Sequence, residues 1–340
     1  MSTTSPIEIV GGGLAGLSLG LGLQRQGVAA TVFEAGDYPR HRVCGEFITG
    51  LDERTMERLG LRDLLSDTLR HREVAWFLDD QRARIQQLPV PALGLSRHVL
   101  DARLARAFVG AGGTLRVGTR VTERTDQPGR VFATGRKLGR SPWLGLKFHC
   151  RRLSLDRDLE LHLGDHAYVG LSRIEGDRVN VCGLFRRRPL SIRGPQLLLA
   201  YLTAAGFRSL GQRIEAAEID RESFCAVAAL NFDRRVESGR RVQLGDACAM
   251  IPPFTGNGMA MAFQSAERAL DPLLAFARGK SSWTETRQAI EAALQARFRV
   301  RLAAADALHP FLLRPRRQRL LTALSRVRLI PFGPLYSALH

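Results

Sequence analysis

The chain has 340 residues, of which 45% are hydrophobic and 24% charged, and it carries a formal net charge of +17. This length and composition predict a globular protein that buries a substantial core in one large domain or two interleaved ones. The apolar runs are all shorter than the roughly 20 residues that span a bilayer, which excludes a membrane-spanning class. No basic segment precedes an apolar stretch at the start, so we expect a cytoplasmic protein.

Nearly all of the positive charge comes from arginine side chains. All but three of the 50 basic residues are arginine, spread through every segment. No nucleic-acid motif accompanies them, so we do not expect a nucleic-acid partner.

The five cysteines are an odd, widely spaced set without a CxxC pair, which predicts neither a disulfide framework nor a metal site.

The first 34 residues predict a strand, a helix and a second strand, over 7–10, 17–26 and 30–33. Between the first strand and the helix, Gly11 to Gly16 fits the pattern GxGxxG. Such glycines allow a tight turn, the close approach of a pyrophosphate and close packing of helix on sheet. The helix N-terminus then faces the phosphates. Glu34 follows the second strand, 23 residues after Gly11, where a carboxylate accepts hydrogen bonds from a ribose diol. The nucleotide-binding residues predicted here are Gly11, Gly13, Leu14, Ala15, Gly16 and Glu34.

The next elements alternate between helical and strand patterns. We expect a polar helix over 52–65, two strands within 74–88, a helix over 97–110 and a strand over 114–121. From 144 to 186 the apolar residues alternate, and Glu175-Gly-Asp177 separates two halves of a hairpin, 166–174 and 178–185. This block is the candidate for a substrate-side sheet.

The last hundred residues predict a strand over 241–244, a glycine turn, a helix over 259–276 and an amphipathic helix that follows Trp283 and is closed by Pro310. The final thirty residues hold arginines at 314, 316, 317, 319, 326 and 328 around a stripe of Leu320, Leu321, Leu324 and Val327. This pattern is typical either of a terminal helix packed on the core or of peripheral contact with anionic lipid at the inner face of a membrane.

A second glycine motif separates FAD from other dinucleotides. A strand ends in Gly245-Asp246, and Gly256-Asn257-Gly258 opens a helix ten residues later. Here the chain resembles the flavoproteins of the p-hydroxybenzoate hydroxylase fold, in particular the geranylgeranyl reductase branch. The resemblance implies that Asp246 contacts the ribityl and phosphate end of FAD. It also implies that the later glycines bring amides beside the pyrimidine edge, where a helix N-terminus complements the anionic reduced flavin. Gly245, Pro253 and Met259 belong to the same implied set.

Two further segments extend the resemblance along most of the first 280 residues. Arg42, Cys44 and Gly45 match a basic-x-Cys-Gly segment that runs past the flavin toward the substrate. Arg97, four residues before Asp101, matches a position on the phosphate side of the cofactor, and Val121 matches one beside the adenine. Cys44 is a candidate proton donor or a packed thiol, and Tyr168 in the hairpin is a candidate pocket residue.

The pattern predicts an α/β fold: a Rossmann-like FAD-binding three-layer ββα domain, an interleaved mixed β-sheet substrate domain and C-terminal helices. The expected FAD-binding parts are 1–73, 97–143 and 231–280. The expected substrate sheet is 74–96 and 144–230, and the C-terminal helical segment is 281–340.

The function expected from these features is a two-electron reduction or dehydrogenation of a lipophilic, isoprenoid or polyketide-like substrate. The alternative is a monooxygenase that hydroxylates an aromatic or polyketide-like substrate through a C4a-hydroperoxide, and a minor one is a protein that binds FAD or lipid without turnover. Thr134 stands where relatives carry an aspartate associated with NAD(P)H, so either a nicotinamide or a separate electron donor could be the reductant. The Trp-x-Trp-x-Ile-Pro run of flavin-dependent halogenases is absent from the sequence, which argues against halogenation.

Overall fold

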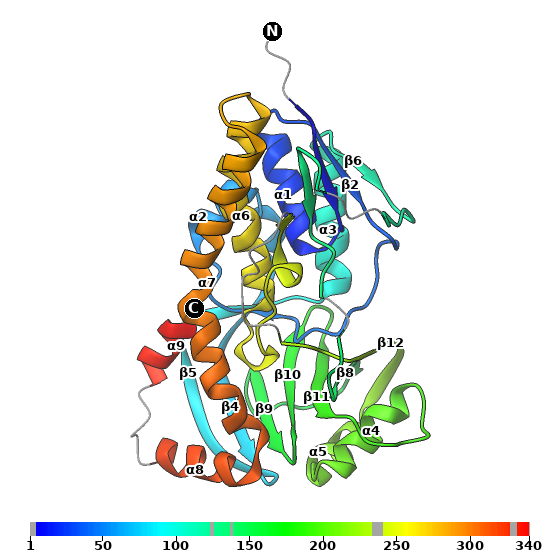
Figure 1. Ribbon diagram of the computed structural model, residues 1–340. Coiled ribbons are helices and arrows are strands. Elements are labelled where there is room, and N and C mark those ends of the chain that lie inside the picture. Colours follow the sequence, from blue (N-terminus) through cyan, green and yellow to red (C-terminus); the bar gives the residue numbers. More distant parts are fainter. Residues whose placement is uncertain (1–4, 123–125, 137–138, 233–240, 327–331, 340) are drawn as a thin grey trace.

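The computed structural model describes residues 5–122, 126–136, 139–232, 241–326 and 332–339. Within them the chain builds two sheets, which lie one above the other in Figure 1 and are joined by long segments that pass between them. The molecule therefore consists of two interleaved sheet-based units, as the sequence predicts.

The smaller sheet is parallel and lies near the N-terminus (Figure 1). Its strand order is β13-β7-β1-β2-β6. The strands are β1 (Ile7–Val10), β2 (Ala30–Phe33), β6 (Thr114–Arg116), β7 (Arg130–Phe132) and β13 (Val242–Gln243). The strands β1, β2 and β7 are short, apolar and largely buried, as expected of strands covered on both faces. The helices packed around them are α1 (Leu14–Arg25), α2 (Glu53–Leu59), α3 (Arg97–Gly110) and α6 (Gly258–Ala277), and they share one apolar core with the sheet.

The larger sheet has eight strands in the order β12-β8-β11-β10-β9-β4-β5-β3. All of its neighbours pair antiparallel except β4 and β9, which are parallel. The strands are β3 (Phe47–Ile48), β4 (Leu69–Leu78), β5 (Gln81–Gly94), β8 (Trp143–Arg151), β9 (Leu159–Gly164), β10 (Ala167–Ile174), β11 (Arg178–Arg186) and β12 (Glu218–Ala228). The predicted hairpin is confirmed as β10 and β11, whose turn places Gly176 and Asp177 at positive φ.

Helices cover the two faces of this sheet differently. One face packs against α4 (Pro195–Ala204) and α5 (Arg208–Glu215) in a second apolar core. Toward the other face lie α7 (Trp283–Leu313), α8 (Pro315–Arg326) and α9 (Phe332–Leu339), and side chains of all three help to line a cavity there. The second face therefore supports the site described below.

Three predicted elements differ from the structure. The strand expected over 114–121 ends at Arg116, because the chain turns at Gly118 (φ +64°) and the Thr119 amide donates to the Glu34 carbonyl instead. The helix expected over 52–65 stops at Leu59, where Gly60 adopts the left-handed conformation, and only a short 3-10 turn, Asp63–Leu65, follows. Pro310 does not end α7, which continues to Leu313.

The predicted boundary at residue 73 falls inside β4, and β3, within the first predicted FAD-binding part, pairs with β5 in the larger sheet. Among the residues that the structure describes, no helix is long and apolar enough to cross a bilayer.

Candidate active site

The glycine loop between β1 and α1 combines a tight backbone contact with an open face. Gly11 has φ +110°, and a Cβ added there would lie 2.2 Å from the carbonyl oxygen of Ala133, so only glycine fits. A Cβ on Gly13 would meet nothing within 4 Å. Gly13 is the N-cap of α1 and, having no side chain, leaves open space at the start of the helix. Such an end binds anions.

Glu34, directly after β2, is buried and held by backbone amides. Its two carboxylate oxygens accept from Gly12 N at 2.8 Å and from Gly36 N at 2.9 Å, and Arg40 donates to it at 2.5 Å. Burial alone would raise the pKa of Glu34, but these amides and the Arg40 guanidinium bring it below its ordinary value. The carboxylate is therefore ionised and suited to accept hydroxyl protons from a ribose.

The Gly245-Asp246 turn lies beside the start of α1. A Cβ on Gly245 would lie 3.2 Å from the Cβ of Ala15, so the turn packs against the first residues of α1. The Asp246 carboxyl lines the cavity. Burial among the cavity walls raises its pKa, while Arg97, Arg136 and Arg42 oppose that shift. An acid in this position can accept hydrogen bonds from the polyol part of a cofactor.

Arg42 and Arg97 share the buried carboxylate of Asp101. Arg97 makes a bidentate contact of 2.8 and 2.9 Å with Asp101, and Arg42 Nε donates to it at 3.0 Å. Arg42 Nη2 is buried without a hydrogen-bond partner among the described residues and lies 4.0 Å from Glu34. The pair therefore presents fixed positive charge between the ribose acid and Asp246, where a pyrophosphate would need it.

The second glycine motif is packed against the start of the larger sheet. Gly256 has φ +69°, and a Cβ there would lie 2.3 Å from the ring of Phe47. Gly258, the first residue of α6, has open space above it. The buried Asn257 side chain donates to the Leu339 carbonyl at 2.7 Å and lies 3.3 Å from the Thr49 hydroxyl. Asn257 thus links this motif to α9 and to the segment after Cys44.

Hydrogen bonds from the larger sheet fix the Cys44-Gly45 segment. Asn180 on β11 donates to the carbonyls of Cys44 and Gly45 at 3.0 and 2.9 Å, and the Ser172 hydroxyl on β10 donates to the Gly45 carbonyl at 2.7 Å. Burial raises the pKa of the Cys44 thiol. Cys44 is therefore a protonated thiol in the cavity wall at neutral pH, which suits a proton donor better than a nucleophile.

Directly behind this segment lies a cluster of fully buried charges. Glu46 forms an ion pair with Lys147 Nζ at 3.2 Å, accepts from the Arg97 amide at 3.0 Å and lies 2.6 Å from His149 Nε2. Burial alone would raise the pKa of Glu46, but the bond from His149 and the Lys147 charge bring it below its ordinary value. Lys147 also lies 3.3 Å from His41 Nδ1. Burial and Lys147 lower the pKa of His41 to about 4.

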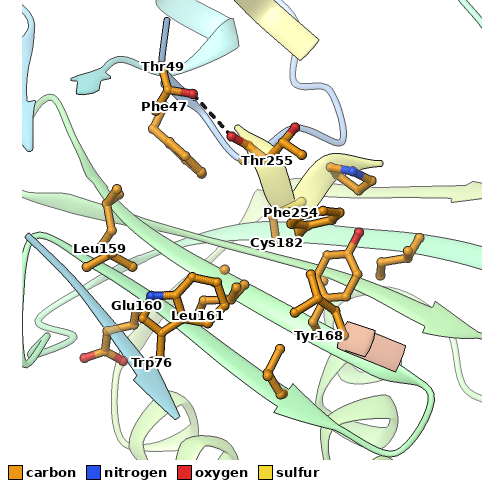
Figure 2. A pocket seen from close by; sticks show the side chains of 18 of the residues that line it. Phe47, Thr49, Trp76, Leu159, Glu160, Leu161, Tyr168, Cys182, Phe254 and Thr255 are labelled. Carbon is orange, nitrogen blue, oxygen red and sulfur yellow. Dashed lines mark hydrogen bonds between the residues drawn. The ribbon is translucent and has the colours of Figure 1, made fainter. Parts of the chain in front are cut away.

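The cavity begins at these segments and runs along the face of the larger sheet. Its volume is about 280 Å³. Figure 2 shows Phe47, Trp76, Phe254 and Tyr168 around one space, with the Thr49 hydroxyl bonded to the Thr255 carbonyl at its upper edge. Burial raises the pKa of Tyr168 well above its ordinary range. The apolar lining includes Val74, Leu161, Leu184, Met250, Leu312 and Leu335.

The structure brings five of the predicted site residues to this cavity. Cys44, Gly45, Pro253, Asp246 and Tyr168 line the cavity directly. Val121 lies beyond the end of β6 rather than within it, although Thr119, two residues earlier, contacts Glu34. Met259 is buried in the core at the start of α6. The remaining predicted positions, Gly11, Gly13, Leu14, Ala15, Gly16, Glu34, Arg42, Arg97, Gly245, Gly256, Asn257 and Gly258, lie on the segments described above.

Sequence reasoning missed the residues behind and beside Cys44. Lys147 and His149 alternate within the otherwise apolar strand β8, so both project from one face, and this pattern could have drawn attention to them. Glu46, Asn180 and Arg136 offered no such signal, because each gains its role from segments distant in sequence.

The residues present fit an FAD molecule. Three features leave room for a bound cofactor: the open space at Gly13, Arg42 Nη2, which has no hydrogen-bond partner among the described residues, and Asp246, which lines the cavity. A glycine loop, a ribose acid and a pair of arginines match a dinucleotide, and the second glycine motif would place the isoalloxazine against Cys44 and Gly45.

Comparisons with known proteins agree with this interpretation. Residues 4–141 match the family model described as an FAD binding domain. A menaquinone reductase of Mycolicibacterium smegmatis is 28% identical over 138 residues, which are 39% of this chain and 34% of that protein. The chain thus matches about a third of the length of this curated relative.

Two solved structures share the fold over nearly the whole chain. The flavin-dependent brominase Bmp2 superposes with a TM-score of 0.78 at 16% identity, covering 98% of this chain and 92% of the other. The probable FAD-dependent monooxygenase pqsL from Pseudomonas aeruginosa superposes with a TM-score of 0.71 at 17% identity, covering 92% and 97%. Together with the matched domain, they define the class of protein: an FAD-dependent oxidoreductase. The likeness to these structures shows that the chain has their fold, and the family match assigns an FAD binding domain to residues 4–141.

Gly11, which is tightly packed, and Gly13, which faces open space, give different predictions. Gly13→Val adds a side chain in open space at an extended backbone position (φ −84°), so we expect the flavin-free protein to unfold at the wild-type temperature. The same side chain fills the space above the helix N-terminus, and FAD affinity should fall at least about 100-fold. Fluorescence titration of FAD measures the affinity.

Gly11→Ala is the matched control, because its Cβ would collide with the Ala133 backbone. It should lower the unfolding temperature of the flavin-free protein itself. Undiminished FAD binding by Gly13→Val would contradict the placement of the pyrophosphate.

Proposed function

We propose that the protein uses FAD to carry out a two-electron reduction or dehydrogenation of a lipophilic substrate. The observation that carries this proposal is the cavity, which starts at the flavin-facing segments Cys44-Gly45 and Asp246 and continues between apolar walls contributed by the sheet and by α7, α8 and α9. An apolar ligand that enters such a space places its reacting carbon beside the cofactor. An isoprenoid or polyketide-like chain suits these walls.

The protonated side chains in the wall favour reduction. Bound reduced FAD would supply the hydride, and a carbon-carbon double bond also needs a proton on its second carbon. Cys44 and Tyr168 both line the cavity, and burial raises the pKa of each. Each therefore keeps its proton at neutral pH and can donate it. The match to a protein named for reducing menaquinone, a lipophilic quinone, supports the same reaction and the reductase branch of the fold.

The second candidate is a monooxygenase that hydroxylates an aromatic or polyketide-like substrate. The likeness to a probable FAD-dependent monooxygenase over 92% of the chain favours it, as does a cavity with few polar groups, because oxygen activation needs a site that excludes water. A protein that binds FAD or lipid without turnover is the minor alternative.

The reductant is a nicotinamide or a separate electron donor. The Thr134 side chain is exposed beyond β7, where relatives place an aspartate. We therefore propose that NADH or NADPH, where it acts, binds only transiently.

Anaerobic and aerobic turnover separate the two reactions. The purified protein should show the absorption bands of bound FAD. Loss of these bands during anaerobic addition of NADH or NADPH would show that the nicotinamide reduces the flavin. A reductase should form saturated or desaturated product without oxygen, whereas a monooxygenase should consume oxygen in equal amount to hydroxylated product. The absence of flavin bands even after FAD is supplied would refute the proposal as a whole.

Substitutions of Cys44 and Tyr168 in the cavity wall identify which side chain donates the proton to the substrate. If Cys44 donates, Cys44→Ala should lower the rate of flavin reoxidation by substrate at least about 100-fold, the usual contribution of a general acid, while the flavin spectrum stays unchanged. Cys182→Ala is the control, since Cys182 also lines the cavity and burial likewise raises its pKa. Tyr168→Phe tests the other candidate in the same assay. Wild-type rates in both Cys44→Ala and Tyr168→Phe would exclude these donors.

We also propose that α8 contacts an anionic membrane surface from which the lipophilic substrate enters. Arg316, Arg319 and Leu320 are exposed on this helix, and Leu321 and Thr322 line the cavity. Of the predicted apolar stripe, Leu321 thus faces the cavity and Leu320 faces solvent. Val327 and Arg328 lie outside the described residues. Gln318 ties the helix to the sheet through the carbonyl of Gly164 at 2.8 Å, so α8 would meet the membrane without leaving the body of the protein.

Vesicle sedimentation tests this contact. The wild-type protein should bind vesicles that contain phosphatidylglycerol more strongly than pure phosphatidylcholine vesicles, and rising salt should weaken the binding. Arg316→Glu combined with Leu320→Ser should lower the affinity at least about tenfold. The pair Arg151→Glu and Val109→Ser, exposed on other elements, is the control. Equal binding to both kinds of vesicle would contradict the proposal.

A further inference from the structure

Three side chains from distant segments meet behind the Cys44 segment. His41 belongs to the loop after β2, His149 lies on β8, and Asp220 faces His149 across the β12 to β8 pairing. One ligand atom from each of the three lies within 4.8 Å of the other two. Histidine nitrogen and carboxylate oxygen are the common protein ligands of zinc and related divalent ions.

The hydrogen bonding of His149 orients it for metal binding. Its Nε2 lies 2.6 Å from the carboxylate of Glu46, which is fully buried and ionised. A proton on Nε2 leaves the lone pair on Nδ1, and Nδ1 is buried with no hydrogen-bond partner among the described residues. A carboxylate that accepts from one nitrogen of a histidine while the other nitrogen faces a ligand site is the usual arrangement of metal-binding histidines. An unpartnered lone pair at full burial is otherwise a cost.

We propose that His41, His149 and Asp220 bind one divalent transition-metal ion of the zinc class. The three ligands leave a fourth coordination position for water or another small ligand. Glu46 orients His149 from behind and helps to offset the charge of the ion. This site is separate from the flavin site and does not depend on the reaction proposed above.

Lys147 determines which nitrogen of His41 carries the proton before the metal ion binds. Its ammonium lies 3.3 Å from His41 Nδ1 and 3.2 Å from Glu46. The ammonium can only donate, so His41 accepts at Nδ1 and carries its proton on Nε2. Coordination through Nε2 moves that proton to Nδ1, and Lys147 then keeps Glu46 as its partner. The ion would join the loop that carries Cys44 to strands β8 and β12, because the three ligands belong to these segments.

The test is zinc binding to the flavin-loaded, tag-free protein after treatment with a chelator. Isothermal titration should give one Zn²⁺ per chain, and Co²⁺ should produce the visible absorption of a protein-bound ion. His41→Ala should weaken Zn²⁺ binding at least about 100-fold and Asp220→Asn at least about tenfold. Both side chains are only half-buried, and thermal unfolding of the metal-free variants checks that they fold.

A second histidine–carboxylate pair supplies the control. His166 lies 2.7 Å from Asp165 at the surface, so His166→Ala should leave Zn²⁺ binding unchanged. The proposal is overturned if the wild-type protein binds no Zn²⁺, if both His41→Ala and Asp220→Asn retain its affinity, or if His166→Ala abolishes binding.

Discussion

One buried carboxylate, that of Glu46, joins the larger sheet to the start of α3. It receives Lys147 and His149 from the larger sheet and the amide of Arg97 from the start of α3. Glu46 holds a left-handed backbone conformation with φ +56°, which costs a residue other than glycine about 1–3 kcal/mol unless its surroundings fix it. Loss of this carboxylate would leave Lys147 charged and buried, at a cost of about 3–5 kcal/mol. The protein is therefore strongly destabilised unless every charged member of the cluster keeps its partner.

The position of the Cys44-Gly45 segment follows from that constraint. Glu46 anchors it on one side, and Asn180 and Ser172 hold its carbonyls from the sheet. Phe47, the next residue, then packs so closely on Gly256 that any side chain there would collide. These contacts set the width of the space between the flavin-facing segments and the substrate sheet. The shape of the cavity therefore depends on the charge cluster behind it.

Some of the site was predictable because its chemistry is local. Gly11 to Gly16 and Glu34 belong to one strand-helix-strand unit, and their spacing implies the geometry of a dinucleotide site. The β10 to β11 hairpin was equally predictable, since alternation and a Glu-Gly-Asp turn define both strands. The errors also have local causes. Gly60 and Gly118 adopt positive φ and end elements that periodicity alone would extend, and Pro310 is accommodated within the last turn of α7.

By itself, the sequence determined that this protein carries a dinucleotide unit at its start, and its second glycine motif indicated FAD. Those conclusions rest on residues whose neighbours along the chain impose their geometry. Only the tertiary structure decided which groups share the buried cluster, because alternation on β8 places Lys147 and His149 on one face but says nothing of what lies opposite. Glu46, His41 and Asp220 reach that face through loops and a neighbouring strand. Burial in the low-dielectric interior, which is a property of the whole fold, then makes the Glu46 carboxylate depend on its partners from the larger sheet.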